Sequence, residues 1–138
     1  MHTLGVVTNL LHAFKVLQKH FYELADEYNL APAQLGALEK LWHQDGLTIT
    51  ELGDKLNLKT STVTALADRM ERDGLLQRKR NDEDRRVVRI YLTEKSRSLK
   101  GKIPDFEQYI MDQLLKGITS QEIKTLNTLL QKFQDTLE

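Results

Sequence analysis

The sequence predicts an α+β protein that is mainly α-helical and carries one small β-hairpin. Apolar residues recur at intervals of three and four along both ends of the chain, which is the spacing of one helix face. Two short segments, 76–80 and 87–92, alternate apolar and polar side chains around a charged turn at 81–84. Between these regions, 48–74 has the start and stop signals of two successive helices.

The composition indicates the class of the protein. Its 138 residues suffice for one domain with a sizeable core, and 40% hydrophobic with 29% charged residues is typical of a soluble globular protein. No apolar run is long enough to span a membrane, and the first residues lack the apolar core of a signal peptide. We therefore expect a cytoplasmic location and no membrane partner. The sequence has no cysteine, which excludes disulfides and thiolate metal sites.

The formal net charge of zero conceals an uneven distribution. Residues 59–100 carry twelve Lys or Arg against seven Asp or Glu, whereas 1–58 and 101–138 each carry more acidic than basic residues. A basic middle between acidic ends is typical of a chain whose middle contacts phosphates. A solvated charged surface is the alternative, and charge alone does not decide between the two.

The two ends of the chain predict long amphipathic helices. Positions 7 to 28 and 123 to 137 repeat the heptad spacing of helices that pack side by side, and Thr119 with Glu122 forms a capping box before the last helix. Pro104 is expected to kink or divide a helical segment at about 94–115. We expect 1–30 and 94–138 to form the helical dimerisation region of an isologous homodimer, with an intramolecular bundle as the alternative. The dimer contacts are assigned to Val7, Leu10, Phe14, Leu17, Ile123, Leu126, Leu130 and Phe133.

Residues 31–93 predict a winged helix-turn-helix region. Its first helix starts at Pro32, carries four apolar residues on one face, and is expected to end near Gly46. Thr48 and Glu51 then form a capping box that opens a second, short helix. These two helices precede the helix that is expected to read DNA.

The third helix of this region starts near Thr60 and stops at Asp73–Gly74. Its inner face is apolar, whereas small hydroxyl side chains lie on the outer face near its start. Such a face fits a major groove, because small residues let the helix sit deep and hydroxyls bond phosphates or bases. Clusters of Ser and Thr also serve as plain helix starts, so the hydroxyls alone leave both interpretations open.

The hairpin forms the wing of the motif. Six Lys or Arg residues fall within 78–89, and the turn places Asp84 directly before Arg85 and Arg86. A carboxylate in this place can hold an arginine in one direction by a charge-assisted hydrogen bond. An arginine so held at a hairpin tip fits a narrow, electronegative minor groove. An exposed cluster of ion pairs, worth little in stability, is the alternative.

Helix-turn-helix and wing together predict a sequence-specific reader of double-stranded DNA. An enzyme is not expected, because no histidine stands beside a serine or cysteine nucleophile motif. His20, Glu23 and Glu27 share a helix face at ligand-like spacing, but a solvated polar strip is the favoured interpretation, so we expect neither a metal nor a cofactor. The alternative functions are a winged helix that binds only protein and, less favoured, a zinc-responsive regulator.

The wing and the third helix resemble two signatures of the MarR family of bacterial regulators. In the wing, the matching residues are Asp84, Arg85, Arg86, Ile90, Leu92 and Thr93. In the third helix and the turn after it, they are Ser61, Thr62, Val63, Thr64, Leu66, Asp68, Arg69, Glu71, Gly74 and Leu75. The order of the elements is similar to that of the family over nearly the whole chain.

This resemblance implies a homodimer that binds a pseudo-palindromic operator in a bacterial cytoplasm, usually as a repressor. Many relatives respond to small anionic or phenolic compounds bound between the dimerisation and DNA-binding regions. The sequence itself names no residue of such a pocket. The residues that would contact DNA or brace the wing are Lys59, Thr60, Ser61, Thr62, Thr64, Ala65, Arg69, Asp84, Arg85 and Arg86.

The chain departs from the family pattern at four positions. Lys59 and Thr60 stand where relatives often have a capping Ser and a Pro, so the third helix is expected to be less well capped. Ala65 replaces a long polar or basic side chain and removes one direct base contact. Ser96 stands where Gly is frequent. The lack of cysteine excludes the peroxide-sensing thiol mechanism that some relatives use.

Overall fold

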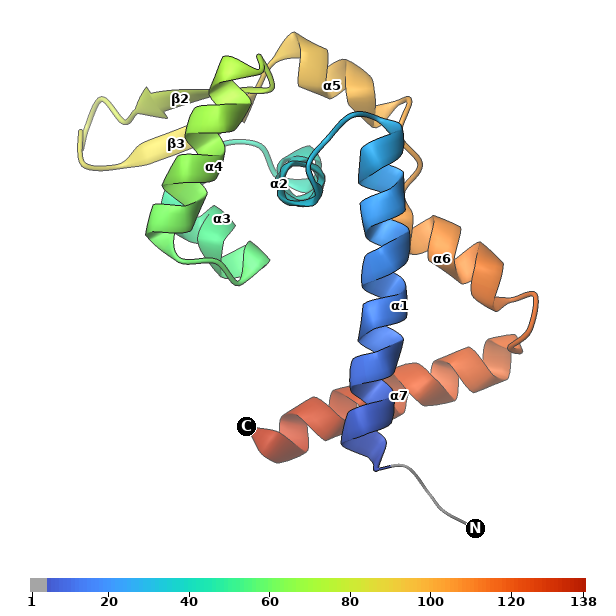
Figure 1. The fold of residues 1–138 in the computed structure, drawn as a ribbon. Helices are drawn as coiled ribbons and strands as arrows, with labels where there is room; N and C mark the ends of the chain where they lie inside the picture. The colour runs from blue at the N-terminus through green and yellow to red at the C-terminus, as the bar shows by residue number, and fades with distance from the viewer. Residues whose placement is uncertain (1–4) are drawn as a thin grey trace. The chain divides into compact units, whose positions relative to one another are not determined.

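The computed structural model describes residues 5–138 and confirms the mainly helical fold with one small sheet (Figure 1). The chain divides into two compact units, with the boundary at Ile103–Pro104. The helices are α1 (Val6–Glu27), α2 (Pro32–His43), α3 (Ile49–Leu56), α4 (Thr60–Arg72), α5 (Glu94–Lys100), α6 (Phe106–Leu114) and α7 (Ser120–Leu137). The strands are β1 (Leu47–Thr48), β2 (Leu76–Arg80) and β3 (Val88–Leu92).

The sheet has three antiparallel strands in the order β1-β3-β2, one more than the predicted hairpin. Its two long strands are the predicted ones, and Arg78 of β2 lies opposite Ile90 of β3. The added strand β1 pairs Leu47 with Ile90. This strand was not predicted because it has only two residues, one of which is also the N-cap of α3. Helix α2 therefore ends at His43 and not near Gly46, since residues 44–46 form the turn into β1.

One apolar core holds together the unit that ends at Ile103. Helices α2, α3 and α4 bury one face each against one another and against the sheet. Burial of a large apolar side chain stabilises a fold by roughly 1.5–3 kcal/mol, so these faces fix how the helices are rotated. The largest fully buried side chains are Leu35, Leu38, Leu41, Leu47, Leu52, Val63, Met70, Leu76 and Ile90, together with Ser96.

Three helices begin with side-chain caps, two of them at the positions predicted from the sequence. Thr48 accepts a hydrogen bond from the backbone of Glu51 at 3.1 Å, and Glu51 accepts one from the backbone of Thr48 at 2.8 Å. Thr119 and Glu122 make the same reciprocal pair before α7. Thr93 caps α5. Helix α4 has no such bond from Lys59, which confirms the expected weaker cap.

The turn between α3 and α4 depends on two special backbone positions. Asn57 adopts the left-handed conformation with φ +57°, which asparagine tolerates better than most residues. Gly53 lies in contact with the turn, because a Cβ added there would stand 2.9 Å from the carbonyl oxygen of Leu58. Helices α3 and α4 therefore approach each other closely only because residue 53 has no side chain.

Helix α1 divides its apolar stripe between two environments. Ala25 is fully buried, and Phe21, Leu24 and Tyr28 pack against the core near the end of the helix. The apolar residues in the first half of α1 are not packed against this core. Among the four predicted dimer contacts there, Val7, Phe14 and Leu17 are exposed and Leu10 is half-buried.

Helix α5 packs on the core of the first unit. The indole Nε1 of Trp42 donates to the carbonyl oxygen of Ser96 at 2.9 Å, and Ser96 is fully buried. The compact unit thus extends past residue 93, the predicted end of the DNA-binding region. The assignment of 94–138 to dimerisation remains a prediction. Pro104 lies between α5 and α6, so it divides the predicted helical segment.

The second unit consists of α6 and α7, and neither helix has a fully buried residue. On α7, the predicted dimer contacts Ile123, Leu130 and Phe133 are half-buried, and Leu126 is exposed. Within residues 5–138, no helix combines the length and apolar character needed to cross a membrane.

The close approach at Gly53 gives a stability prediction. Gly53→Ala should lower the free energy of unfolding by roughly 1–3 kcal/mol, because the new Cβ overpacks against backbone atoms of the turn. Gly36→Ala is the matched control, since a Cβ there meets only Leu56 Cδ2 at 3.5 Å, an ordinary contact. That control should be neutral or stabilising by up to about 1 kcal/mol, because alanine has the higher helix propensity. Urea unfolding checks both values. Equal effects of the two substitutions would contradict the steric account.

Candidate nucleic-acid interface

Helix α4 separates its side chains into a buried face and an exposed face. Val63, Ala67 and Met70 are at most 1% exposed, and Leu66 is 7% exposed. Every residue predicted to contact DNA from this helix is exposed, namely Lys59, Thr60, Ser61, Thr62, Thr64, Ala65 and Arg69. The rotation of α4 that fills the core therefore presents the predicted reading face to solvent.

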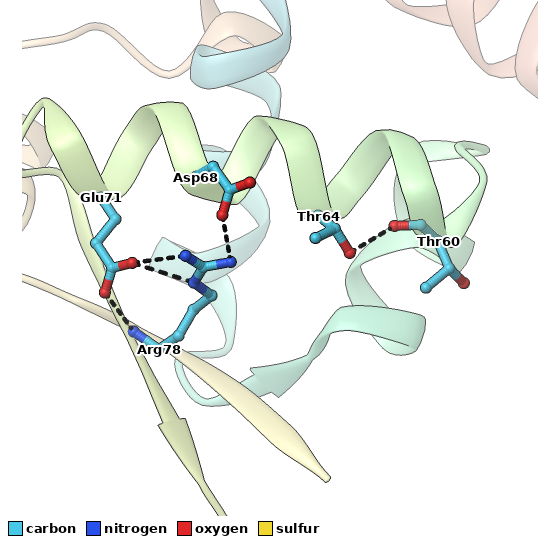
Figure 2. A network of polar contacts seen from close by, with 5 residues as sticks. All are labelled: Thr60, Thr64, Asp68, Glu71 and Arg78. Atoms are coloured by element: carbon cyan, nitrogen blue, oxygen red, sulfur yellow. Dashed lines mark hydrogen bonds and ion pairs between the residues drawn. The ribbon is translucent and has the colours of Figure 1, made fainter. Parts of the chain in front are cut away.

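The exposed face of α4 offers particular hydrogen-bonding chemistry. The Thr64 hydroxyl donates to the carbonyl oxygen of Thr60 at 3.0 Å, as Figure 2 shows. With its proton used in this way, Thr64 Oγ1 can still accept a bond from an exocyclic amino group of a base. The first backbone N–H groups of α4 receive no side-chain cap, and such groups favour a phosphate.

A tight turn carries the tip of the wing. The backbone N–H of Asn81 donates to the carbonyl oxygen of Val87, and the N–H of Val87 donates to that of Asp84, both at 2.9 Å. The Asn81 side chain also accepts from the N–H of Glu83 at 2.8 Å. These bonds close the turn, so the residues between β2 and β3 have a defined backbone.

Asp84 holds one wing arginine in place, as the sequence predicts, and that arginine is Arg86. The Asp84 carboxylate accepts from the backbone N–H and Nε of Arg86, both at 3.1 Å, and from its Nη2 at 3.2 Å. The side chain of Arg86 is nevertheless 91% exposed. Its orientation is therefore restricted while its guanidinium stays accessible to a ligand.

The Arg86 side chain, followed by its backbone N–H, holds the pKa of Asp84 below its ordinary value. Since this pKa is depressed in the folded chain, the interaction is complete above the ordinary pKa of aspartate. It disappears only as pH falls through the depressed value. The brace on Arg86 is therefore intact at neutral pH.

Most of the other basic residues of the hairpin make intramolecular contacts. Arg80 donates to the carbonyl oxygen of Arg85 at 2.7 Å, and Arg89 donates to that of Gly46 at 2.9 Å. Lys79 Nζ lies 5.4 Å from the centre of the Tyr91 ring. The charge excess that marks this segment in the sequence thus has two parts: side chains that hold the wing together, and Arg85 and Arg86 at its tip.

Arg78 makes an interaction that was not predicted from the sequence. Its guanidinium lies between Asp68 and Glu71 of α4, with Nη1 2.6 Å from Asp68 Oδ1 and Nη2 2.7 Å from Glu71 Oε1 (Figure 2). Hydrogen bonding to Arg78 lowers the pKa of Glu71, and bonding to Glu71 raises the pKa of Arg78. Two carboxylates three residues apart on one helix, followed by an arginine after the turn, are the signal that was available in the sequence.

Three segments meet at one open depression on this unit. It is lined by the start of α3, the start of α4 and the end of the wing turn at Arg86 to Val88. The lining residues are Thr48, Ile49, Thr50, Thr60, Thr64, Arg86, Val87 and Val88. The structure therefore brings the start of the predicted reading helix and the braced wing arginine to the same surface. Hydroxyl groups and a guanidinium are suited to the phosphates of a DNA backbone.

The zinc interpretation receives no support from the side-chain arrangement. Within residues 5–138, no three His, Cys, Asp or Glu side chains are placed to hold a metal ion together.

Comparison with known proteins decides the family. The model of the MarR family matches residues 30–88, which cover the helix-turn-helix and most of the wing. The chain is also 31% identical over 99% of its length to the uncharacterized HTH-type transcriptional regulator YsmB of Bacillus subtilis, 94% of which it covers. The chain belongs to the MarR family. Another relative is the organic hydroperoxide resistance transcriptional regulator of B. subtilis, 36% identical over 88% of this chain and 81% of its own length.

Solved structures agree with this membership of the MarR family. A MarR family protein from Bacillus stearothermophilus has a TM-score of 0.73 at 32% identity, covering 95% of this chain and 92% of its own. A putative MarR-like regulator from Bacillus cereus, at 23% identity, has a TM-score of 0.83 with 96% of both chains covered. It shares the fold. So does the overoxidized AbfR bound to DNA, with a TM-score of 0.71 at 17% identity, 96% of this chain and 92% of its own.

The fold, the exposed face of α4 and the family together define the general activity of the chain. This member of the MarR family is a DNA-binding transcriptional regulator with a winged helix-turn-helix fold. Its named relatives are transcriptional regulators.

Proposed function

We propose that the chain acts as a homodimeric repressor that binds a pseudo-palindromic operator through α4 and the wing. In each subunit α4 enters the major groove and the wing contacts the adjacent minor groove. The observation that carries this proposal is the convergence of the start of α4 and the braced Arg86 on one open surface.

Individual roles follow from the chemistry of the exposed side chains. Ser61, Thr62 and Arg69 supply donors for bases and phosphates, whereas Thr64 and Ala65 present an acceptor and a methyl group. Lys59 and Thr60, at the uncapped start of α4, are suited to a backbone phosphate. Arg86 enters the minor groove with Arg85 beside it, and Asp84 braces Arg86 without contacting DNA.

The proposed homodimer accounts for the exposed apolar stripes at the two ends of the chain. An isologous interface between copies of α1 and α7 would cover Val7, Phe14 and Leu126, which the single chain leaves exposed. Two readers joined in this way place their α4 helices about one DNA turn apart, ~34 Å or ~10 bp between half-site centres.

The proposed repressor also responds to a small anionic or phenolic effector, in keeping with the family resemblance. An effector that prefers a dimer with another spacing of the two readers draws the population away from DNA. The shift is limited by the difference in its affinity for the two states. The chain has no cysteine, so such a response does not proceed through a thiol.

The wing proposal is tested on a mixed-sequence DNA duplex. Arg86→Ala should weaken binding by ~1–3 kcal/mol, or roughly fivefold to a hundredfold, because the variant has no oriented cation at the wing tip. The slope of log K against log salt should become shallower by about 0.9 for each phosphate that the variant no longer neutralises. Fluorescence anisotropy at several salt concentrations measures both quantities.

The matched control for this experiment is Lys100→Ala. It removes an exposed positive charge from α5, outside α4 and the wing, and should leave the affinity and the salt slope close to wild type. Wild-type binding by Arg86→Ala would show that the wing assignment is wrong. Weak, salt-independent binding by the unaltered protein would favour a protein-binding module instead.

The dimer proposal is tested by a charge on the apolar stripe of α1. Phe14→Glu should raise the dissociation constant of the dimer about tenfold or more, since it places an unpaired carboxylate in an apolar interface. Val16→Glu is the control, because Val16 is also 58% exposed but lies on another face of α1. Analytical ultracentrifugation distinguishes the two variants. Dissociation caused equally by both substitutions, or by neither, would contradict the assigned stripe.

A further inference from the structure

A single arginine joins the reading helix to the wing. Arg78 is the third residue of β2, and the Glu71 carboxylate of α4 contacts it in two ways. Glu71 Oε1 accepts from the side chain, 3.2 Å from Nε and 2.7 Å from Nη2. Glu71 Oε2 accepts from the backbone N–H of the same residue at 3.4 Å. With Asp68 on the other side of the guanidinium, α4 holds both the main chain and the side chain at this point (Figure 2).

The position of Arg78 in the sheet lets this interaction affect the orientation of the wing. Strand β2 is an edge strand, so its only partner in the sheet is β3. From residue 78 the strand continues through Lys79 and Arg80 directly into the turn that carries Asp84 and Arg86. The angle at which the wing leaves the core therefore depends on how the outer edge of β2 is held against α4.

The charges of this cluster are unexpected on a surface that meets DNA. Asp68 and Glu71 are exposed carboxylates on α4, on the same helix as the residues proposed to enter the major groove. Arg78 carries one charge against their two, so the cluster retains a negative charge that repels phosphates. Neutral side chains at 68 and 71 would favour DNA by charge alone. Any contribution of the Asp68 and Glu71 carboxylates to DNA binding must therefore act through Arg78.

We propose that Arg78 is a positioning residue: held by Asp68 and Glu71, it fixes the wing at one angle to α4 so that both contact DNA together. The inference rests on the proposed DNA-binding mode and adds to it three residues that act without touching DNA. The forked guanidinium restricts the angle between the wing and α4, because its planar donors meet two carboxylates in a fixed geometry. The three side chains are only partly buried, with Arg78 27% exposed, so they add little to stability.

If Glu71 positions the wing, neutralising it should weaken DNA binding, whereas electrostatics alone predicts tighter binding. Glu71→Gln removes a negative charge from the DNA-binding side, so charge alone predicts tighter binding. If Glu71 positions the wing, the variant binds an A-tract duplex roughly fivefold to tenfold more weakly. Its preference for the A-tract over a G·C-rich duplex of equal length also falls, because that preference reports entry of an arginine into a narrow minor groove.

Glu83→Gln is the matched control, since it makes the same chemical change at an exposed wing residue outside the cluster. It should bind both duplexes as tightly as wild type or more tightly. Arg78→Lys is a second variant, which keeps the positive charge but loses the fork, and it should behave like Glu71→Gln. Circular dichroism and urea unfolding of each variant check that the helices remain folded.

Three results would overturn the proposal. The first is binding by Glu71→Gln as tight as by Glu83→Gln, and the second is wild-type binding by Arg78→Lys. The third is an equal loss on both duplexes with the A-tract preference intact, which would give the cluster a general structural role. Each of these leaves the proposed repressor standing, because wild-type binding and the effect of Arg86→Ala are unaffected. A wild-type protein that binds neither duplex would overturn both.

Discussion

Val63, Ala67 and Met70 have almost no exposed surface, and their packing against α2, α3 and β2 fixes the rotation of α4 about its axis. Turning this helix by one residue would expose apolar side chains whose burial is worth roughly 1.5–3 kcal/mol each. The core therefore determines which side chains of α4 face outward. The hydroxyl groups, Ala65 and Arg69 are accessible because the residues between them in the sequence are buried. The face of α4 that we propose to read DNA is thus a consequence of packing.

The second constraint is electrostatic, and it distinguishes arginines that build the wing from arginines that are free to act. Arg78, Arg80 and Arg89 donate to carboxylates or carbonyl oxygens within the chain. Arg86 is held by Asp84 yet stays open to solvent. A protein with no net charge can thus carry a concentrated basic segment that does not bind anions indiscriminately. Intramolecular contacts fix most of the arginines, and Asp84 orients Arg86, which we propose for the minor groove.

The features that the sequence predicted correctly are governed by near neighbours in the chain. Capping at Thr48 and Thr119 and the brace between Asp84 and Arg86 each involve residues within four positions, so local chemistry determines them. The features that were missed join residues far apart. Strand β1 pairs with a strand more than forty residues later, and its two residues leave no periodic signal.

The interactions of Arg78 and Arg89 show the same limit. The spacing of Asp68, Glu71 and Arg78 indicated only that an ion pair was available, since each interaction also depends on the angle at which two elements cross. The apolar stripe of α1 illustrates a different limit, because its heptad spacing is continuous while its environment is not. Leu24 and Tyr28 pack on the core of their own chain, whereas Phe14 does not. Periodicity indicates that a face is apolar, and only the fold shows what covers it.

We propose that two rigid readers, each joining α4 to an oriented wing, recognise DNA together. Selection of bound sequences from a random pool of double-stranded DNA tests this joint recognition. We expect enrichment of an inverted repeat with half-site centres ~10 bp apart. We also expect A·T-rich steps with a narrow minor groove on the outer side of each half-site. An unenriched pool, or a single half-site with no repeat and no preference at its flank, would show that the two readers do not act together on DNA.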